Sequence, residues 1–415
     1  MKPQCRTIVV KIASRCNLNC SYCYMYNLGD TSYKYQPKLM SHKTIDSLMH
    51  RVKEHCKKHD IKRFDFVIHG GEPLLAPQSL LEYFLDTAKN ILEPNIYCVF
   101  FIQTNGTLIT KEWVELFEKY DLNIGVSLDG NKKQNNKNRV YHSGKGSYND
   151  VIRGIQFLRE NNTTKRKFGI LTVVDIENDP IELYNLYKKN GFTSVDFLLP
   201  DHNHNNPPKR LHKELENNLE YGNWLIGLFD EWYNDDDALD IRFFNQIVQL
   251  ILGGNTGGDN LGVNNNDVLV LETSGEYEAV DVLKCCGESF TKTGVNVTEY
   301  SIDHALTTPL AHAYYMSHKY LPKRCLACPV SEICGGGYIP HRYKSGEGFN
   351  NPSVYCNDLL KLITHIQEKV YEFLPADLIE KTGIEKISYK SALQIINDNL
   401  IYISNNSYEN ILESF

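Results

Sequence analysis

The sequence predicts an α/β protein in which a parallel sheet is followed by a cysteine-rich region and a helical carboxyl-terminal segment. Three observations carry this prediction. Strand-like and helix-like segments alternate as far as residue 200, polar or glycine residues follow the strand-like runs, and seven of the twelve cysteines fall into two spaced groups. Alternation at this spacing favours parallel strands joined by helical crossovers.

The first half of the chain supplies the alternating elements. The strand-like runs are rich in β-branched and aromatic residues, and several end in a polar or glycine turn. They cover residues 6–13, 64–73, 97–106, 123–130, 168–174 and 194–199. Helical segments are expected at 41–60, 78–92, 111–120, 147–161 and 180–190. Because chemistry in α/β proteins sits at the carboxyl edge of the sheet, we expect functional residues just after these strands.

The pattern changes near residue 200. A polar, proline-containing loop (200–209) precedes expected helices at 212–235 and 241–252, and a Gly/Asn-rich stretch (253–266) indicates a linker or long loop. A hairpin-like run and the second cysteine group follow, and residues 357–415 are helical in pattern. We therefore expect four regions, at residues 1–200, 201–266, 267–357 and 358–415.

Composition limits the classes of function. The net charge of −7 argues against a general nucleic-acid or anionic-membrane surface, which requires a basic face. No run of 18 apolar residues and no apolar signal segment is present, so we expect a cytoplasmic protein. In that reducing compartment, cysteines are expected to be metal ligands or buried thiols.

The first cysteine group (Cys16, Cys20 and Cys23) directly follows the first expected strand. A structural zinc site closes with four ligands, and the nearest histidine downstream, His42, lies nineteen residues beyond the group. Thiolates also favour iron–sulfur clusters. A cluster held by three thiolates would leave one iron open to a substrate or cofactor, whereas the alternative is a partial structural zinc site.

The second cysteine group (Cys325, Cys328, Cys334 and Cys356) supplies four thiols, enough for a closed site. On spacing alone it is compatible with a zinc ribbon as well as with an iron–sulfur cluster. The adjacent pair Cys285 and Cys286 has no obvious complete ligand set.

The stretch CNLNCSYC (16–23) resembles the signature of radical S-adenosylmethionine (radical SAM) enzymes, and three short motifs recur behind it in the family's order. These are GGEP (70–73), QTNG (103–106) and SLDG (127–130). The resemblance implies a partial (β/α)6 barrel, a 4Fe–4S cluster on the first cysteine group, and S-adenosylmethionine on the open iron. One electron from the cluster then yields a 5′-deoxyadenosyl radical that abstracts a substrate hydrogen.

The same resemblance implies the cofactor-binding residues. Glu72 would support the methionine ammonium, Ser127 would meet the ribose or methionyl portion, and Arg139 would bind the carboxylate. The residues assigned to S-adenosylmethionine in this way are Tyr22, Gly70, Gly71, Glu72, Pro73, Thr104, Asn105, Ser127, Asp129 and Arg139.

The segment from Cys325 to Cys356 resembles a SPASM domain, which carries auxiliary 4Fe–4S clusters. It departs from the full pattern at Tyr338, where such domains commonly have a further cysteine. We therefore expect one complete auxiliary cluster on the second cysteine group, and a second auxiliary cluster lacks an evident ligand set.

A finer resemblance is to maturases that form cyclophanes in ribosomally synthesised peptides. It implies hydrogen abstraction from a side chain, attack of the carbon radical on an aromatic ring, and loss of an electron and a proton. The expected partners are a precursor peptide with a leader and an electron donor such as flavodoxin or ferredoxin. Candidate proton acceptors are Asp281, His341 and His202, with His204 beside the last.

Other functions stay open at this point. Related enzymes epimerise residues, form thioethers or oxidise a sulfatase cysteine, and for an epimerase Cys285 or Cys286 would be the hydrogen donor. A zinc-binding scaffold without catalysis is the non-enzyme alternative.

Overall fold

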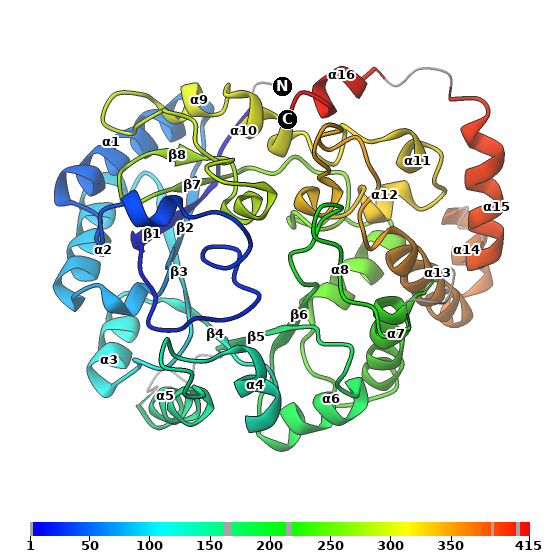
Figure 1. The fold of residues 1–415 in the computed structure, drawn as a ribbon, viewed down its shortest axis with the longest axis horizontal. Coiled ribbons are helices and arrows are strands. Elements are labelled where there is room, and N and C mark those ends of the chain that lie inside the picture. Colours follow the sequence, from blue (N-terminus) through cyan, green and yellow to red (C-terminus); the bar gives the residue numbers. More distant parts are fainter. Residues whose placement is uncertain (1–2, 162–167, 213–217, 383–385, 404–406) are drawn as a thin grey trace. The chain divides into compact units, whose positions relative to one another are not determined.

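The computed structural model describes residues 3–161, 168–212, 218–382, 386–403 and 407–415 (Figure 1). The chain divides into two compact units that alternate along the sequence. Unit 1 comprises Met1–Val173, Phe192–Ser194 and Asp267–Tyr315, and unit 2 comprises Val174–Gly191, Val195–Asn266 and Met316–Phe415. Each unit therefore combines segments that lie far apart in the sequence.

Unit 1 is built from the predicted strand–helix alternation. Its parallel strands are β1 (Thr7–Ala13), β2 (Arg63–Gly70), β3 (Tyr97–Thr104), β4 (Asn123–Ser127) and β5 (Gly169–Val173). The intervening helices are α1 (His42–His59), α2 (Gln78–Leu92), α3 (Lys111–Lys119), α4 (Lys132–Asn138) and α5 (Tyr148–Asn161). The α/β prediction with a parallel sheet is confirmed, and every expected strand of this unit is present.

The sheet of unit 1 gains two strands from a later part of the chain. Strand β7 (Val268–Leu271) pairs with β1 in parallel, Thr7 opposite Val268, and β8 (Tyr277–Glu278) pairs with β7 antiparallel. The described strands of the unit thus follow the order β5-β4-β3-β2-β1-β7-β8. The hairpin-like pattern predicted that β7 and β8 pair with each other. Periodicity could not indicate which earlier strand of the sheet this pair would join.

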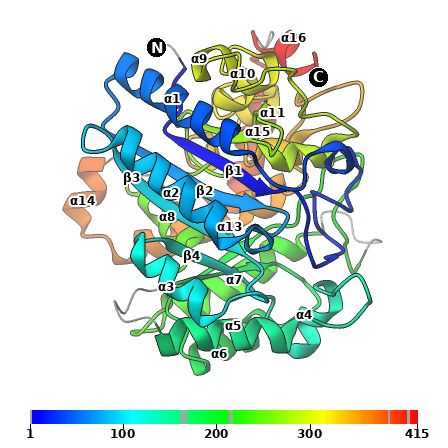
Figure 2. The ribbon, with the colours of Figure 1, turned by 90° about the vertical axis from the view of Figure 1, so that its left-hand side faces the viewer.

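Helices α1 and α2 lie side by side against the strands β1, β2 and β3 (Figure 2). Their amphipathic pattern buries one face of each helix, as expected for a covering layer. Phe66 of β2 packs against Phe84 of α2 and Phe100 of β3, with each pair of ring centroids 5.7 Å apart. These contacts fix the sheet beneath the helices, so the strands' carboxyl ends form a stable edge.

Unit 2 is mainly helical. Its longer elements are α6 (Pro180–Lys189), β6 (Val195–Leu198), α7 (Glu220–Tyr233), α8 (Arg242–Ile251), α13 (Cys356–Phe373) and α15 (Tyr389–Leu400). Helices α7 and α13 pack closely because Gly222 allows it: a Cβ there would lie 2.9 Å from the carbonyl oxygen of Asp358. The helical carboxyl-terminal prediction is confirmed for the described residues.

Short helices complete the two units. In unit 1 these are α9 (Ile302–Ala305) and α10 (Pro309–Tyr315), and in unit 2 they are α11 (Lys323–Leu326), α12 (Ser331–Cys334), α14 (Ala376–Thr382) and α16 (Glu409–Leu412). Part of the helix expected at 212–235 falls on residues 213–217, which lie outside the described residues, and the described helix begins at Glu220. Among the described helices, none combines the length and apolar character that crossing a bilayer requires.

Candidate active site and cysteine centres

The first cysteine group lies in the loop that leaves β1. Backbone hydrogen bonds from Cys23 N to Cys20 O (3.0 Å) and from Asn27 N to Cys23 O (2.8 Å) turn the chain back on itself. Burial, reinforced by Cys20, raises the pKa of Cys23 to about 12, and burial also raises the pKa of Cys16 and Cys20. Three half-buried cysteines in one short loop suit a metal centre, because a bound metal deprotonates its cysteine ligands.

The GGEP turn lies directly beside this loop. A Cβ on Gly70 would lie 2.2 Å from the carbonyl oxygen of Ala13, and one on Gly71 would lie 1.9 Å from the hydroxyl of Tyr26. The backbone of Gly71 also donates to Ala13 O at 2.8 Å. The glycines therefore allow two backbone segments to approach more closely than side chains would permit. Pro73 then begins a short 3-10 turn, Pro73–Leu75.

Glu72 joins the ends of β2 and β3. Its carboxylate accepts hydrogen bonds from Leu74 N (3.0 Å), the Thr104 hydroxyl (2.6 Å) and Asn105 N (2.8 Å). Asn105 in turn donates through Nδ2 to Asn17 Oδ1 at 2.8 Å, and the same nitrogen lies 3.7 Å from Cys16 Sγ. Glu72, Thr104 and Asn105 are thus brought together beside the first cysteine group.

A chain of polar contacts leads from Tyr22 to Arg139. The Tyr22 hydroxyl donates to Asp129 Oδ2 at 2.5 Å and accepts from Arg139 Nη1 at 2.9 Å. Arg139 is buried, and its Nε has no hydrogen-bond partner among the described residues. A buried guanidinium with an unused donor is prepared to bind an anion such as a carboxylate. Ser127, at the end of β4, accepts from Gln103 Nε2 at 2.9 Å.

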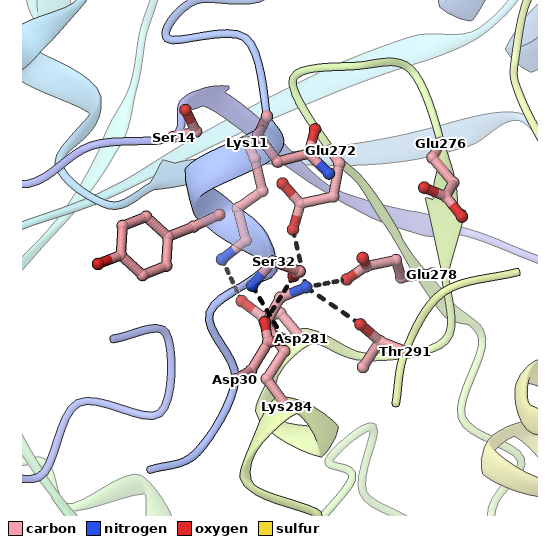
Figure 3. A network of polar contacts seen from close by, with 12 residues as sticks. Lys11, Ser14, Asp30, Ser32, Glu272, Glu276, Glu278, Asp281, Lys284 and Thr291 are labelled. Atoms are coloured by element: carbon pink, nitrogen blue, oxygen red, sulfur yellow. Dashed lines mark hydrogen bonds and ion pairs between the residues drawn. The ribbon is translucent and has the colours of Figure 1, made fainter. Parts of the chain in front are cut away.

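Asp281 lies in the 3-10 segment Asp281–Cys286 that follows β8. Its carboxylate forms a buried ion pair with Lys11 (Figure 3). It also accepts a hydrogen bond from the Tyr24 hydroxyl at 2.7 Å. Burial opposes the charge, but Lys11 and His69 outweigh it and lower the pKa of Asp281. Asp281 is therefore a carboxylate at neutral pH.

His69 stands on the other side of Lys11. Its Nδ1 lies 2.9 Å from Lys11 Nζ, and burial together with Lys11 lowers the pKa of His69 to about 4. Lys11, Tyr24 and His69 were not among the predicted site residues. Lys11 stands inside an apolar strand, between Val10 and Ile12, and that position was the available signal.

Lys284 forms a second buried network three residues after Asp281. Its ammonium lies 3.1 Å from Glu272 Oε1, 2.6 Å from Glu278 Oε2 and 3.0 Å from the Thr291 hydroxyl (Figure 3). Lys292 adds a contact to Glu278 at 2.9 Å. Burial works against the charge of Glu278, yet the two lysines lower its pKa. The neighbouring thiols of Cys285 and Cys286 are buried.

The second cysteine group lies in unit 2. Cys325 is on α11, Cys334 ends α12 and Cys356 begins α13. All four cysteines of the group line a single pocket, together with Arg324. Burial raises the pKa of Cys325 to about 12 and that of Cys328 to about 11. Four thiols around one pocket supply the ligand number that a closed four-thiolate cluster requires.

Three successive glycines, Gly335 to Gly337, follow Cys334 in the left-handed region, with φ of 59°, 76° and 67°. A Cβ on Gly336 would lie 3.1 Å from Nη1 of Arg342 and 3.8 Å from Sγ of Cys325. Arg342 is fully buried, and burial lowers its pKa to about 10, so it stays charged at neutral pH. Neither Arg342 nor Arg324 was among the predicted site residues.

The candidate histidines also lie in unit 2. His341 is buried against Tyr338 and Tyr355 in edge-on contacts, and burial, followed by the effect of His202, lowers its pKa to about 3. His202 donates through Nδ1 to the Asn206 carbonyl at 3.0 Å, and His204 uses Nε2 on the Pro352 carbonyl at 2.8 Å. The histidines thus gather in unit 2, whereas Asp281 lies in unit 1 with the cofactor residues predicted for S-adenosylmethionine.

Comparison with known proteins identifies relatives of this arrangement. Residues 10–194 match the model of the radical SAM superfamily. The chain is 25% identical over 366 residues to a cysteine-type anaerobic sulfatase-maturating enzyme of Clostridium novyi (84% of this chain, 91% of the relative). It is 24% identical over 414 residues to a serine-type anaerobic sulfatase-maturating enzyme of Bacteroides thetaiotaomicron (92% of this chain, 96% of the relative).

A solved structure supports the same fold. Native anSMEcpe with bound AdoMet and Kp18Cys peptide superposes with a TM-score of 0.74 at 22% identity, covering 91% of this chain and 99% of that one. That structure holds bound AdoMet. In this chain, a loop with three thiols and the unused Nε–H of the buried Arg139 fit a 4Fe–4S cluster and the carboxylate of S-adenosylmethionine. Within this chain, the match to the radical SAM superfamily therefore covers residues 10–194, the part that holds the first cysteine group, the GGEP turn and Arg139.

Proposed function

We propose that this chain is a radical SAM maturase that oxidises a side chain of a peptide or protein substrate by two electrons. One observation carries the proposal: the chain has two separate sets of cysteines. The first set has three thiols and would leave one coordination position open, whereas the second set has four thiols that line one pocket. The first arrangement suits a cofactor bound at an open iron, and the second suits electron transfer without ligand exchange.

The residues of unit 1 bind and orient the cofactor in this proposal. The cluster with S-adenosylmethionine supplies a 5′-deoxyadenosyl radical when both are bound. Cys16, Cys20 and Cys23 would hold the cluster, and the buried Arg139, whose Nε–H has no partner among the described residues, would bind the methionine carboxylate. Because its oxygens already accept three donors, Glu72 mainly fixes the ends of β2 and β3. That role differs from direct support of the ammonium, which the resemblance implies.

Asp281 is the best supported proton acceptor among the three candidates. The oxidation releases one electron and one proton after hydrogen abstraction, so a base must be ready to accept the proton. Asp281 is ionised, lies in the unit that holds the cofactor residues, and is oriented by Lys11 and Tyr24. His341 is a weaker candidate because its imidazole is enclosed by Tyr338 and Tyr355.

Two products are compatible with this chemistry. The finer prediction is a cyclophane, in which a Cβ radical closes onto an aromatic ring of a precursor peptide. The sequence relatives favour a second candidate, oxidation of a cysteine or serine in a sulfatase, because two sulfatase-maturating enzymes align with 84% and 92% of this chain. Tyr338, which replaces an expected ligand of a second auxiliary cluster, favours the first candidate.

The partners follow from the same proposal. The substrate is a peptide segment, with a leader in the cyclophane case, and a flavodoxin or ferredoxin delivers the electron that starts each turnover. We expect the reaction to take place in a reducing cytoplasm, where cysteine thiolates are available as cluster ligands.

Coexpression separates the two products. The chain is produced anaerobically with the short peptide encoded beside its gene or, separately, with a sulfatase peptide that contains the target cysteine. A cyclophane is expected to remove two hydrogens, about 2 Da, and to protect a short block ending in an aromatic residue from fragmentation. A change confined to the sulfatase cysteine would instead establish the second candidate. A product of unchanged mass with deuterium from solvent at an α-carbon would indicate epimerisation.

An Asp281→Asn variant tests the base. It should still form 5′-deoxyadenosine but lose product by about a hundredfold or more, the usual size of a general-base contribution. Equal product yields from the variant and the wild type would exclude Asp281 as the base. A His202→Gln variant, whose imidazole already donates to a loop carbonyl, serves as the comparison.

A further inference from the structure

Arg342 is a buried cation with an unusual set of partners. The residue has no exposed surface, and its guanidinium donates to two backbone carbonyls, Ser317 O at 2.9 Å and Tyr320 O at 3.1 Å. Its Nε is buried without a hydrogen-bond partner, and no carboxylate of the described residues is among the groups that act on its charge. Carbonyl oxygens satisfy N–H groups but do not neutralise the charge.

An uncompensated charge in a protein interior is costly, so buried charges are normally paired or bound to a ligand. Within unit 2, the charge of Arg342 interacts with the thiols of Cys325 and Cys334 and with the imidazole of His318. Gly336 stands between Arg342 and Cys325, and its missing side chain lets the guanidinium approach the pocket. The group that these thiols bind is therefore the expected anionic partner of the Arg342 guanidinium.

Arg324 approaches the same pocket from another side. It lines the cavity and donates to Asn357 Oδ1 at 2.9 Å, and its charge opposes the rise in the pKa of Cys356 that burial causes. Two arginines thus lie close to the pocket that the four thiols line, so a group bound in this pocket must carry net negative charge.

We propose that Arg342 is the charge partner of an auxiliary iron–sulfur cluster on Cys325, Cys328, Cys334 and Cys356, and that it raises the reduction potential of this cluster. A four-thiolate 4Fe–4S centre is an anion, because its thiolates outweigh the charge of the core, and net charge and hydrogen bonds at the sulfur atoms set its potential. A nearby fixed cation stabilises the reduced, more negative form more than the oxidised form.

The electron balance makes this positioning role useful. When the substrate radical becomes product, one electron leaves to the auxiliary centre and one proton leaves to the base, so the centre gains one negative charge. Arg342 favours that gain. The inference rests on the part of the proposed function that assigns an iron–sulfur cluster to the second cysteine group.

The test measures the potential of the auxiliary cluster alone. In a Cys16→Ala/Cys20→Ala/Cys23→Ala background, the first cysteine group cannot hold its cluster, so the remaining iron and the EPR signal of the reduced protein report the second group. Redox titration is carried out on this protein, on Arg342→Met and Arg342→Lys made within it, and on the matched control Arg242→Met, an arginine that is largely exposed and pairs with Asp196. The same arginine variants in the otherwise wild-type chain give product per 5′-deoxyadenosine.

The expected result is a lower potential in Arg342→Met, a smaller decrease in Arg342→Lys, and no change in Arg242→Met. Product per 5′-deoxyadenosine should fall about tenfold in Arg342→Met, within the range usual for residues that support metal ligands. If Arg342→Met loses its iron but Arg342→Lys retains it, the need for a cation is equally supported.

A potential equal to that of the parent in Arg342→Met would overturn the inference. So would loss of iron from both arginine variants alike, since this indicates a purely structural role for the guanidinium fork. If the parent itself holds zinc or no iron at its second group, the cluster assignment fails, and that failure is visible before any arginine is changed.

Discussion

Lys284 in unit 1 and Arg342 in unit 2 are both buried cations, but their charges are compensated in different ways. Lys284 lies among Glu272, Glu278 and Thr291, so the protein itself provides the counter-charge. Arg342 has two backbone carbonyls and a pocket of thiols. A buried cation that has no carboxylate partner therefore indicates that a bound anion is missing, whereas a buried cation that is paired with carboxylates, as Lys284 is, indicates a structural role.

Loss of the iron–sulfur cluster proposed for the second cysteine group of unit 2 should produce the largest effect. In Cys325→Ala, about four iron atoms per chain should be lost and product formation should cease, since three thiolates and an unpaired arginine hold the centre poorly. Some cofactor cleavage should persist because the first cysteine group is intact. The matched variant Cys20→Ala should show the reverse, with no 5′-deoxyadenosine and an intact auxiliary cluster. Iron analysis and chromatography of 5′-deoxyadenosine check both, and normal product from Cys325→Ala would refute the electron-acceptor role.

Removal of the cation from unit 1 should cost stability. Lys284→Met leaves Glu272 and Glu278 buried beside each other, which should lower the free energy of unfolding by about 3 to 5 kcal/mol. Lys292→Met removes a lysine whose side chain is 24% exposed, and it should cost much less. Denaturant titration of both variants sharpens the comparison, and equal losses would mean that burial of Lys284 does not matter.

Arg139 provides an intermediate case, because its guanidinium contacts Tyr22 but retains a free Nε–H. If its anion is the carboxylate of S-adenosylmethionine, Arg139→Gln should weaken cofactor binding by about 2 kcal/mol, or roughly thirtyfold, through loss of a charge-assisted hydrogen bond. Equilibrium binding of S-adenosylmethionine to the reconstituted protein measures this. Unchanged affinity would assign Arg139 to structure alone.

The smallest expected effect concerns His341, a histidine that is uncharged in the folded protein. Burial lowers the pKa of His341 to about 3, below its unfolded value of about 6.5, so between these values the unfolded chain binds the extra proton. The stability that His341 contributes is therefore lost as the pH falls below about 6.5. Between about pH 7.5 and 5.5 the wild type should lose about 1 kcal/mol more than His341→Phe, which keeps a ring between the tyrosines. Parallel unfolding curves for the two proteins at both pH values would contradict this.

The features that could be predicted from the sequence are those that depend on residues close together in the chain. The parallel strands, the two cysteine groups and the glycine turn at Gly70 each depend on neighbours within a few residues, and the structure contains all of them. The roles of the predicted site residues remain predictions. The alternation of apolar and polar residues could not indicate that Lys11 pairs with Asp281, since that contact spans most of the chain.

The buried arginine was missed for a related reason. Arg342 follows His341 in a stretch that has no helical or strand periodicity, and arginine is normally an exposed residue. Only the fold shows that a glycine run directs it toward Cys325. A charged residue within ten positions of a cysteine group is the weak signal that sequence reasoning could have used.

The parallel pairing of β7 with β1 has a consequence for biosynthesis. Strand β1 emerges from the ribosome early, but its partner at Val268–Leu271 and the counter-ion of Lys11 at Asp281 emerge only after the first two segments of unit 2, Val174–Gly191 and Val195–Asn266, have been synthesised. Until then one edge of β1 is an open template for pairing with other chains, and an apolar strand carries an unpaired ammonium. A gene truncated after the first 200 residues therefore encodes an aggregation-prone nascent chain rather than a separable catalytic module, and production of this protein depends on protecting that edge during translation.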